Sequence, residues 1–225
     1  MTVAHLHILR AFLIGSTLAV PLIQGETAAG DLYGANLREP AQTRPANRAS
    51  RYRSAAAAVS EPGCQCNPGL YTVAYLTADT ALPVRGAGAA VSMAQKDTRF
   101  EPSVLAVSVG DEVSFPNLDP FFHNVFSYSQ PKKFDLGRYP QGETSIVRFD
   151  KPGLVRVFCE IHSSMRAYVH VLETPYHAVS DERGRFHIPA IIPGTYTLHI
   201  WQENLPEYSQ SVTVTADSTY IEVNP

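Results

Sequence analysis

The residues after Leu70 alternate between short apolar runs and tight turns, and this rhythm constrains the fold more than any other feature of the chain. Runs such as VLAVSV (104–109) and LVRVFC (154–159) are rich in β-branched residues, and turn sequences such as GD (110–111) and DKPG (150–153) separate them. Short runs of this kind between turn residues are typical of antiparallel strands. Because no long segment has the helical period, we predict an all-β sandwich or barrel.

The expected strands fall into two groups, with a division near Thr174. The second unit, residues 174–225, is small for an independent core. We therefore expect it to pack on the first unit or to borrow a strand from it, with 71–76 as the candidate. The strands are expected at 71–76, 104–109, 112–115, 123–129, 145–149, 154–159, 167–172, 176–180, 185–188, 195–201, 211–214 and 220–223, with a turn at 189–194.

The N-terminal segment has the features of an export signal. Arg10 precedes an apolar run over 11–23, and small residues follow up to Ala29, the expected cleavage site. The run is short for a membrane span, which needs about 20 residues. We expect residues 1–29 to be a signal peptide and the mature chain to be periplasmic or secreted without a membrane span; an uncleaved anchor is the alternative.

The segment between the signal and the strands, residues 30–69, lacks a hydrophobic period and is rich in Ala, Arg, Pro and Ser, so we expect a flexible linker. The net charge of −3 argues against a nucleic-acid partner, because such proteins usually carry a basic excess. The hydrophobic fraction of 44% is enough for a packed core.

The chain has three cysteines, and an odd number leaves at least one thiol without an internal partner. In an oxidising compartment such a thiol is a liability unless it is buried or bound to a metal, which directs attention to Cys159. Cys64 and Cys66 stand one residue apart, a strained spacing for a disulfide. For them a structural or redox role is favoured over a Cu(I) relay.

The segment FCEIHSSM (158–165) carries the chemistry, because it places Cys159, His162 and Met165 at the spacing C-x2-H-x2-M, with His123 upstream. Two imidazoles and a thiolate with a distant thioether form the trigonal set of an electron-transfer copper site. The thiolate and thioether suit Cu(I), while imidazole tolerates Cu(II). The alternative is that Cys159 is a small buried hydrophobic residue in a structural loop.

Residues 99–172 resemble the cupredoxins, the blue copper proteins of the plastocyanin and amicyanin type. The resemblance lies in FEPSVLAVSVGDEVSFPN, HNVFSYS, FDKPGLVRVFCEIHSSM and AYVHVL. It implies a Greek-key β-sandwich over residues 70–173 that holds one type 1 copper ion. It also implies the ligands His123, Cys159, His162 and Met165, and Asn124 as the residue that ties the two ligand loops together.

The two-residue gap between His162 and Met165 is similar to that of amicyanin. The layout is similar to bacterial proteins labelled methylamine-utilisation or plastocyanin-like. In those proteins a carboxypeptidase-regulatory-like β module accompanies the cupredoxin, and DERGRFHIPAIIPGTYTLHIW (181–201) resembles that module.

The function expected from these features is electron transfer rather than catalysis. A redox protein partner would dock near His162, which we expect Phe121, Phe122 and Ile161 to surround. The alternative is a copper-binding or scaffold module without electron transfer: a chaperone, a sensor, or an adhesion or carbohydrate-type β protein. A copper enzyme is disfavoured, since the sequence offers no second group of histidines at ligand spacing.

Overall fold

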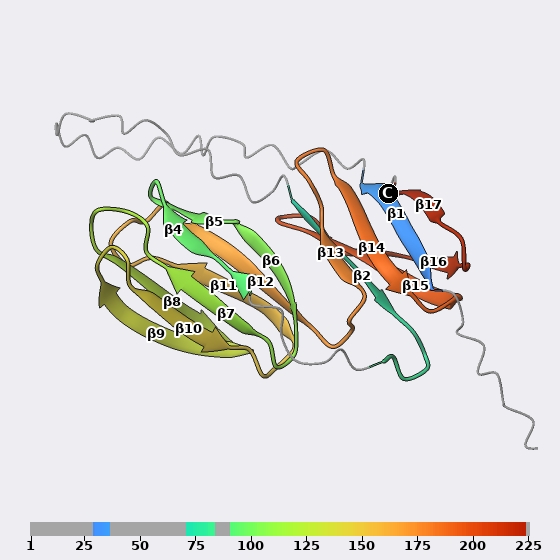
Figure 1. Ribbon diagram of the computed structural model, residues 1–225, viewed down its shortest axis with the longest axis horizontal. Helices are drawn as coiled ribbons and strands as arrows, with labels where there is room; N and C mark the ends of the chain where they lie inside the picture. The colour runs from blue at the N-terminus through green and yellow to red at the C-terminus, as the bar shows by residue number, and fades with distance from the viewer. Residues whose placement is uncertain (1–28, 37–70, 84–90, 224–225) are drawn as a thin grey trace, which may run out of the picture.

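The computed structural model describes residues 29–36, 71–83 and 91–223. Within these ranges the chain forms seventeen β-strands and no helix, as predicted for an all-β protein (Figure 1). The described part accordingly offers no helix that could cross a membrane. Residues 1–28 of the expected signal peptide lie outside the described residues, as do Cys64, Cys66 and linker residues 37–69.

The first domain is a two-layer β-sandwich built from strands β3 to β12. One sheet has the order β10-β7-β3 and the other β6-β12-β11-β8-β9, and β4 and β5 form a hairpin. β12 runs parallel to β6 and antiparallel to β11. The strands are β3 (Val91–Ser92), β4 (Ala94–Lys96), β5 (Arg99–Glu101), β6 (Val104–Ser108), β7 (Glu112–Pro116), β8 (His123–Ser129), β9 (Lys132–Tyr139), β10 (Thr144–Arg148), β11 (Gly153–Phe158) and β12 (Arg166–Leu172).

Alternating side chains of these strands fill the space between the two sheets. Val155 and Val157 of β11 face inward with Phe115 of β7, and all three are completely buried. Cys159 and Met165 belong to the same core cluster. The two sulfur-bearing residues of the motif are therefore held by close packing, which restricts their movement.

The second domain consists of β1 (Gly30–Asn36), β2 (Thr72–Thr77), β13 (His177–Val179), β14 (Arg185–Ile191), β15 (Gly194–Gln202), β16 (Tyr208–Val214) and β17 (Thr219–Val223). Its sheets have the orders β14-β1-β17 and β13-β2-β15-β16. β2 lies between β13 and β15, so the second domain does take a strand from residues 71–76, as expected.

Two sequence-based domain boundaries are wrong in the structure, and one turn is shorter than expected. The linker expected over 30–69 begins with β1, which pairs antiparallel with β14 and parallel with β17 and buries Leu32 completely. The cupredoxin boundary expected at residue 70 is too early, because β2 belongs to the second domain. The turn expected at 189–194 is shorter, since β14 continues to Ile191.

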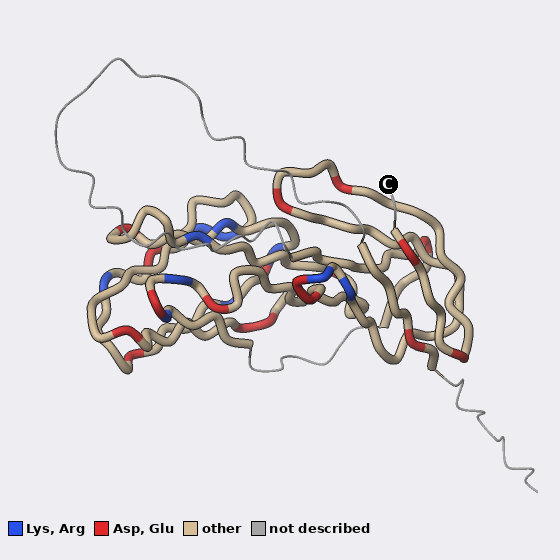
Figure 2. Tube along the Cα trace, turned by 90° about the horizontal axis from the view of Figure 1, so that it is seen from above, with Lys and Arg blue, Asp and Glu red and all other residues tan. Residues whose placement is uncertain are grey.

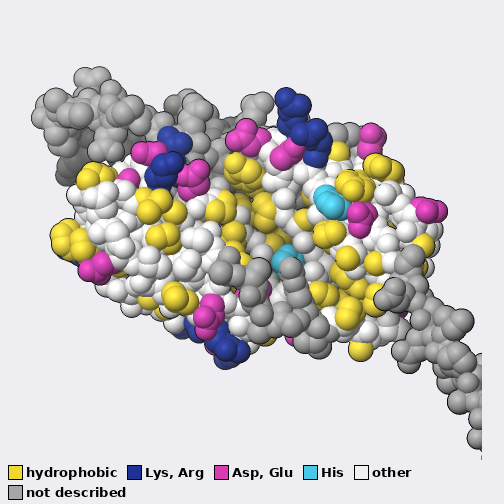
Figure 3. All heavy atoms as spheres, in the orientation of Figure 1, with side chains coloured by type: hydrophobic (Ala, Val, Ile, Leu, Met, Phe, Trp, Pro, Cys, Tyr) yellow, Lys and Arg dark blue, Asp and Glu magenta, His cyan; other side chains and the backbone are white. Residues whose placement is uncertain are grey.

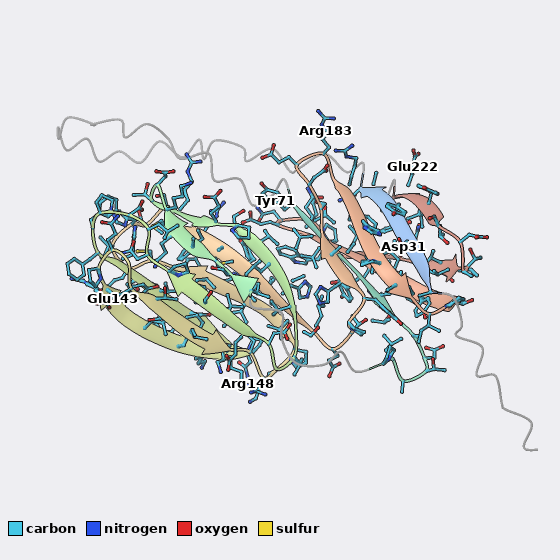
Figure 4. The ribbon with its side chains drawn as sticks, in the orientation of Figure 1. Asp31, Tyr71, Glu143, Arg148, Arg183 and Glu222 are labelled. Atoms are coloured by element: carbon cyan, nitrogen blue, oxygen red, sulfur yellow. The ribbon has the colours of Figure 1, made fainter. Side chains whose placement is uncertain are left out.

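The two domains pack together through a third apolar cluster. Val104, Tyr168 and Leu172 of the first domain contact Val73 and Trp201 of the second. Tyr71, which belongs to the same cluster, lies between the two domains in Figure 4. Acidic and basic side chains are interspersed over both domains (Figure 2). Apolar contacts thus join the domains, with polar contacts at one edge that are described below.

Candidate metal centre

His123 is the first residue of β8, and its imidazole is completely buried. Its Nε2–H donates a hydrogen bond of 2.8 Å to Oδ2 of Asp119. This bond assigns the proton to Nε2, which leaves the lone pair of Nδ1 free to bind a metal ion. A carboxylate behind a histidine ligand also fixes the orientation of the ring.

Asp119 is itself held by the backbone of a neighbouring hairpin. Its Oδ1 accepts a hydrogen bond from the amide of Asp97 at 2.7 Å, and its Oδ2 accepts one from the amide of Thr98 at 2.9 Å. Burial acts to raise the pKa of Asp119, but the hydrogen bonds from Thr98, His123 and Asp97 outweigh it and hold the pKa below its ordinary value. Asp119 is therefore an anion that supports His123.

The loop that carries Asp119 is shaped by Asn117, which is completely buried. Its amide nitrogen donates to the carbonyl oxygens of Phe121 and Tyr139, and its Oδ1 accepts a hydrogen bond from the amide of Asp119. Neither Asn117 nor Asp119 was predicted from the sequence to belong to the site. The available signal was an acidic residue four positions before the histidine ligand.

Cys159, His162 and Met165 lie on the loop that connects β11 to β12. The amide of Cys159 donates to the carbonyl oxygen of Met165 at 3.3 Å, and the amide of Met165 donates to that of His162 at 3.0 Å. Cys159 is 5% exposed and Met165 is 1% exposed, while His162 is partly buried. The loop thus presents its two sulfur side chains to the interior and its imidazole nearer to the surface.

Three donor atoms converge at this place. Sγ of Cys159 lies 3.8 Å from Nδ1 of His123 and 3.8 Å from Nδ1 of His162, and the two Nδ1 atoms are 3.2 Å apart. In the described part of the chain this trio is the one group of His, Cys, Asp and Glu side chains with the spacing for a shared metal ion. The predicted residues His123, Cys159 and His162 are therefore brought together, with Met165 on the same loop.

These separations fit a single metal ion. With metal–nitrogen and metal–sulfur distances of about 2.0 and 2.3 Å and ligands about 120° apart, neighbouring donor atoms lie about 3.5 to 3.7 Å from one another. The observed distances of 3.2 to 3.8 Å bracket these values. Two imidazoles, a thiolate and a nearby thioether are also the donors that favour copper.

Asn124, expected to tie the ligand loops together, makes contacts to both sides. Its Oδ1 accepts a hydrogen bond from the amide of Glu160, next to Cys159, at 3.2 Å. Its amide group donates to Oδ1 of Asp135 and to the carbonyl oxygen of Gly137. The side chain therefore joins the start of β8 to the loop after β11.

Two family models match parts of this chain. Residues 87–172 match the copper binding proteins of the plastocyanin/azurin family, and residues 170–220 match domain II of polysaccharide lyase family 4, an fn3-like domain. The second match names a different module from the carboxypeptidase-regulatory-like one expected from the sequence. No curated protein matches the chain.

Solved structures similar to the chain include two cupredoxins and an enzyme. A copper-containing nitrite reductase from Thermus scotoductus SA-01 is 27% identical with a TM-score of 0.37; the match covers 44% of this chain but only 25% of that enzyme. A reduced amicyanin variant is 21% identical with a TM-score of 0.36, covering 44% of this chain and 98% of amicyanin. A purple cupredoxin from Nitrosopumilus maritimus is 20% identical with a TM-score of 0.33, and the match covers 36% of this chain and 99% of that cupredoxin.

The family match over 87–172 coincides with the first domain, whose strands begin at Val91 and end at Leu172. It includes all four residues of the predicted ligand set and the sandwich that holds them. The first domain is therefore a cupredoxin domain of the plastocyanin/azurin family of copper-binding proteins, joined to an fn3-like β domain.

Proposed function

We propose that this protein carries single electrons through one copper ion bound by His123, Cys159, His162 and Met165. The convergence of three donor atoms, one from the first residue of β8 and two from the β11–β12 loop whose sulfur side chains pack in the core, is the observation that supports this function. An electron carrier needs a site that changes little between Cu(II) and Cu(I). A mixed set of imidazole and sulfur ligands in a rigid core meets that need.

An apolar rim beside His162 offers a place for electrons to leave. We define this rim as Leu118, Phe121, Phe122 and Ile161, whose exposed fractions are 49%, 41%, 54% and 41%. The ring of Phe121 lies 5.6 Å from that of His162 and 5.1 Å from that of His123. Exposed apolar side chains also occur elsewhere on the surface, as Figure 3 shows for one face. The rim differs because it adjoins a metal ligand.

We also propose that the protein is exported and exchanges electrons with a redox protein partner. An export signal at residues 1–29 would place the mature chain in the periplasm or outside the cell, where a copper carrier meets other redox proteins. The partner would be a redox protein that docks through apolar contacts on the rim. Large exposed apolar side chains close together often mark such contacts.

The test is the rate of electron self-exchange between the Cu(I) and Cu(II) forms of the protein, measured by NMR line broadening. We expect reversible one-electron reduction in the unmodified chain. We also expect Ile161→Asp to slow self-exchange at least about tenfold, because two like charges would face each other across the encounter surface. Ile146→Asp is the matched control, since Ile146 is 61% exposed on β10, where it pairs with Ser114 of β7 and contacts no predicted ligand in the strand register.

Two results would argue against this function. Equal self-exchange rates for the Ile161→Asp and Ile146→Asp variants would show that electrons do not leave the protein through the rim. Irreversible reduction combined with rapid loss of copper to a chelator would favour a copper-binding module that delivers or senses the metal.

A further inference from the structure

Glu203 lies in the turn between β15 and β16 of the second domain, and its side chain contacts the strand that follows the copper loop. The β15–β16 hairpin extends toward the cupredoxin domain (Figure 1). Oε1 of Glu203 accepts a hydrogen bond of 2.5 Å from the hydroxyl of Tyr168, and it lies 3.6 Å from Nη2 of Arg166. The Glu203 side chain is only 7% exposed. It is thus a nearly buried carboxylate whose partners among the described residues, Tyr168 and Arg166, both belong to β12.

These partners stand at the base of the copper loop. Arg166 directly follows Met165, and it pairs with Phe158, the residue before Cys159, as the last pair of the β11–β12 ladder. Tyr168 lies two residues further along the same face of β12. Any movement of this end of β12 would therefore be passed through one peptide bond to Met165.

The hydrogen bond to Tyr168 is the stronger of the two contacts. The Arg166 side chain is 46% exposed, and such ion pairs contribute little. Tyr168 is only 8% exposed, and burial together with Glu203 raises its pKa to about 12, so the hydroxyl keeps its proton and donates it. A charged acceptor strengthens this bond, and removal of the carboxylate leaves a nearly buried hydroxyl without its partner.

We propose that Glu203 is a positioning residue, by which the second domain holds the start of β12 and so fixes Met165 relative to Cys159 and His162. In this role the second domain is part of the metal centre's support, although it supplies no ligand. The effect on copper rests on the function proposed above. The effect on the loop itself does not, because it depends only on contacts within the protein chain.

The first experiment therefore uses the metal-free full chain and measures hydrogen exchange at the amides of Cys159 and Met165. Both amides donate within the loop. We expect Glu203→Ala to speed exchange at both sites at least about tenfold, because the loop opens more often when its base is released. Glu207→Ala is the matched control: it removes a carboxylate near the same turn, but one that contacts Tyr75 and His199 of the second domain.

The second experiment compares the copper-loaded proteins. Glu203→Ala should change the reduction potential and the visible absorption spectrum, since both depend on how closely the thioether approaches the copper. Glu203→Gln should have a smaller effect, because its amide oxygen still accepts from Tyr168. Tyr168→Phe, which removes the donor, should reproduce most of the Glu203→Ala effect.

The outcomes separate this inference from the proposed function. If the unmodified chain takes up copper without blue absorption, the electron-transfer function fails, while the exchange experiment still decides the role of Glu203. If the Glu203 and Tyr168 variants have the same amide exchange rates, reduction potential and visible spectrum as Glu207→Ala, then Glu203 does not position the copper loop. Should Glu203→Ala not fold, Glu203→Gln and Tyr168→Phe provide the same comparison.

Discussion

Asp119 shows how a single carboxylate can organise a metal site without touching the metal. It receives a side-chain hydrogen bond from His123 and two backbone hydrogen bonds from the β4–β5 turn. Asp97 and Thr98, at that turn, both have positive φ values, 53° and 56°, which direct their amides to one acceptor. Local turn geometry is thereby linked to the orientation of a ligand far away in the sequence.

Replacement of Asp119 by Ala should weaken copper binding by about 10- to 100-fold, the usual cost of losing the residue behind a metal-bound histidine. The same change should lower the free energy of unfolding by about 1 to 3 kcal/mol, because two backbone amides lose their acceptor. Competition with a copper chelator and urea denaturation provide the two measurements. Asp150→Ala is the control, since Asp150 forms only exposed ion pairs. Unchanged copper affinity in Asp119→Ala would show that His123 needs no support.

The buried ring of His170 should make the stability of the protein depend on pH. Its ring lies 5.5 Å from that of Tyr75 and 5.7 Å from that of Trp201, and its Nδ1 has no hydrogen-bond partner among the described residues. Burial lowers the pKa of His170 below its ordinary value of 6.5, because this site disfavours the charged form. The unfolded chain therefore binds more protons than the folded one just below pH 6.5.

The free energy of unfolding should accordingly fall as the pH drops below 6.5 toward the lowered pKa of folded His170. This one group should lower it by up to about 1.4 kcal/mol per pH unit. Above pH 6.5 the contribution of His170 to the free energy of unfolding should not change with pH. Urea denaturation between pH 5 and 7.5 measures it, with His170→Phe as the comparison, because that variant keeps a ring but cannot be protonated. Parallel stability curves for the two proteins would rule out a contribution from His170.

At the scale of single elements, the attachment of β1 depends on Gly184. This glycine has a φ of +76°, and a Cβ atom placed on it would lie 2.3 Å from the backbone oxygen of Asn36, the last residue of β1. The carbonyl oxygen of Gly184 also accepts a hydrogen bond from the amide of Asn36 at 2.9 Å. The turn and the end of the strand are therefore in direct backbone contact.

Gly184→Ala should lower the free energy of unfolding by about 2 to 4 kcal/mol, because backbone strain and a steric clash act together. Gly137→Ala is the matched control: its φ of +69° imposes similar strain, but no atom lies within 4 Å of the added Cβ. That variant should lose only about 1 kcal/mol. Thermal or urea denaturation measures both, and equal losses would mean that the contact with Asn36 is unimportant.

The elements that could be predicted from the sequence are those with local signals. β8, β11 and β12 alternate or concentrate apolar residues, and turn residues bound them, so their positions followed from the pattern, as did the position of the ligand loop between β11 and β12. β9 was missed because it is an edge strand with charged residues, whose burial alternates only partly.

β1 was missed for a different reason. Its sequence, GDLYGAN, contains two glycines, an aspartate and an asparagine, which are typical of turns. It becomes a strand because β14 and β17 provide partners on both sides. Asp119 escaped prediction in the same way, since its three hydrogen-bond donors come from two separate segments. Interactions between distant segments, rather than local preference, decide these cases.

At the scale of the whole molecule, the two domains share an apolar interface, so we expect them to unfold together. Val104 of β6 is 1% exposed and packs in this interface. Val104→Asp would bury a carboxylate between the domains at a cost of several kcal/mol, which separation of the domains would relieve.

Differential scanning calorimetry should therefore show one transition for the unmodified chain and two for Val104→Asp. The variant should keep its copper site if the domains only separate, although the loop base would lose the contact with Glu203. Two transitions in the unmodified chain would show that the interface does not couple the domains.

The proposed function requires one copper ion held by His123, Cys159, His162 and Met165, with the thiolate as a direct ligand. The direct test is titration of the protein with Cu(II), followed by visible absorption. We expect an intense blue absorption that saturates at one copper per chain and disappears in Cys159→Ser. A colourless copper complex, or a blue one that survives Cys159→Ser, would contradict it.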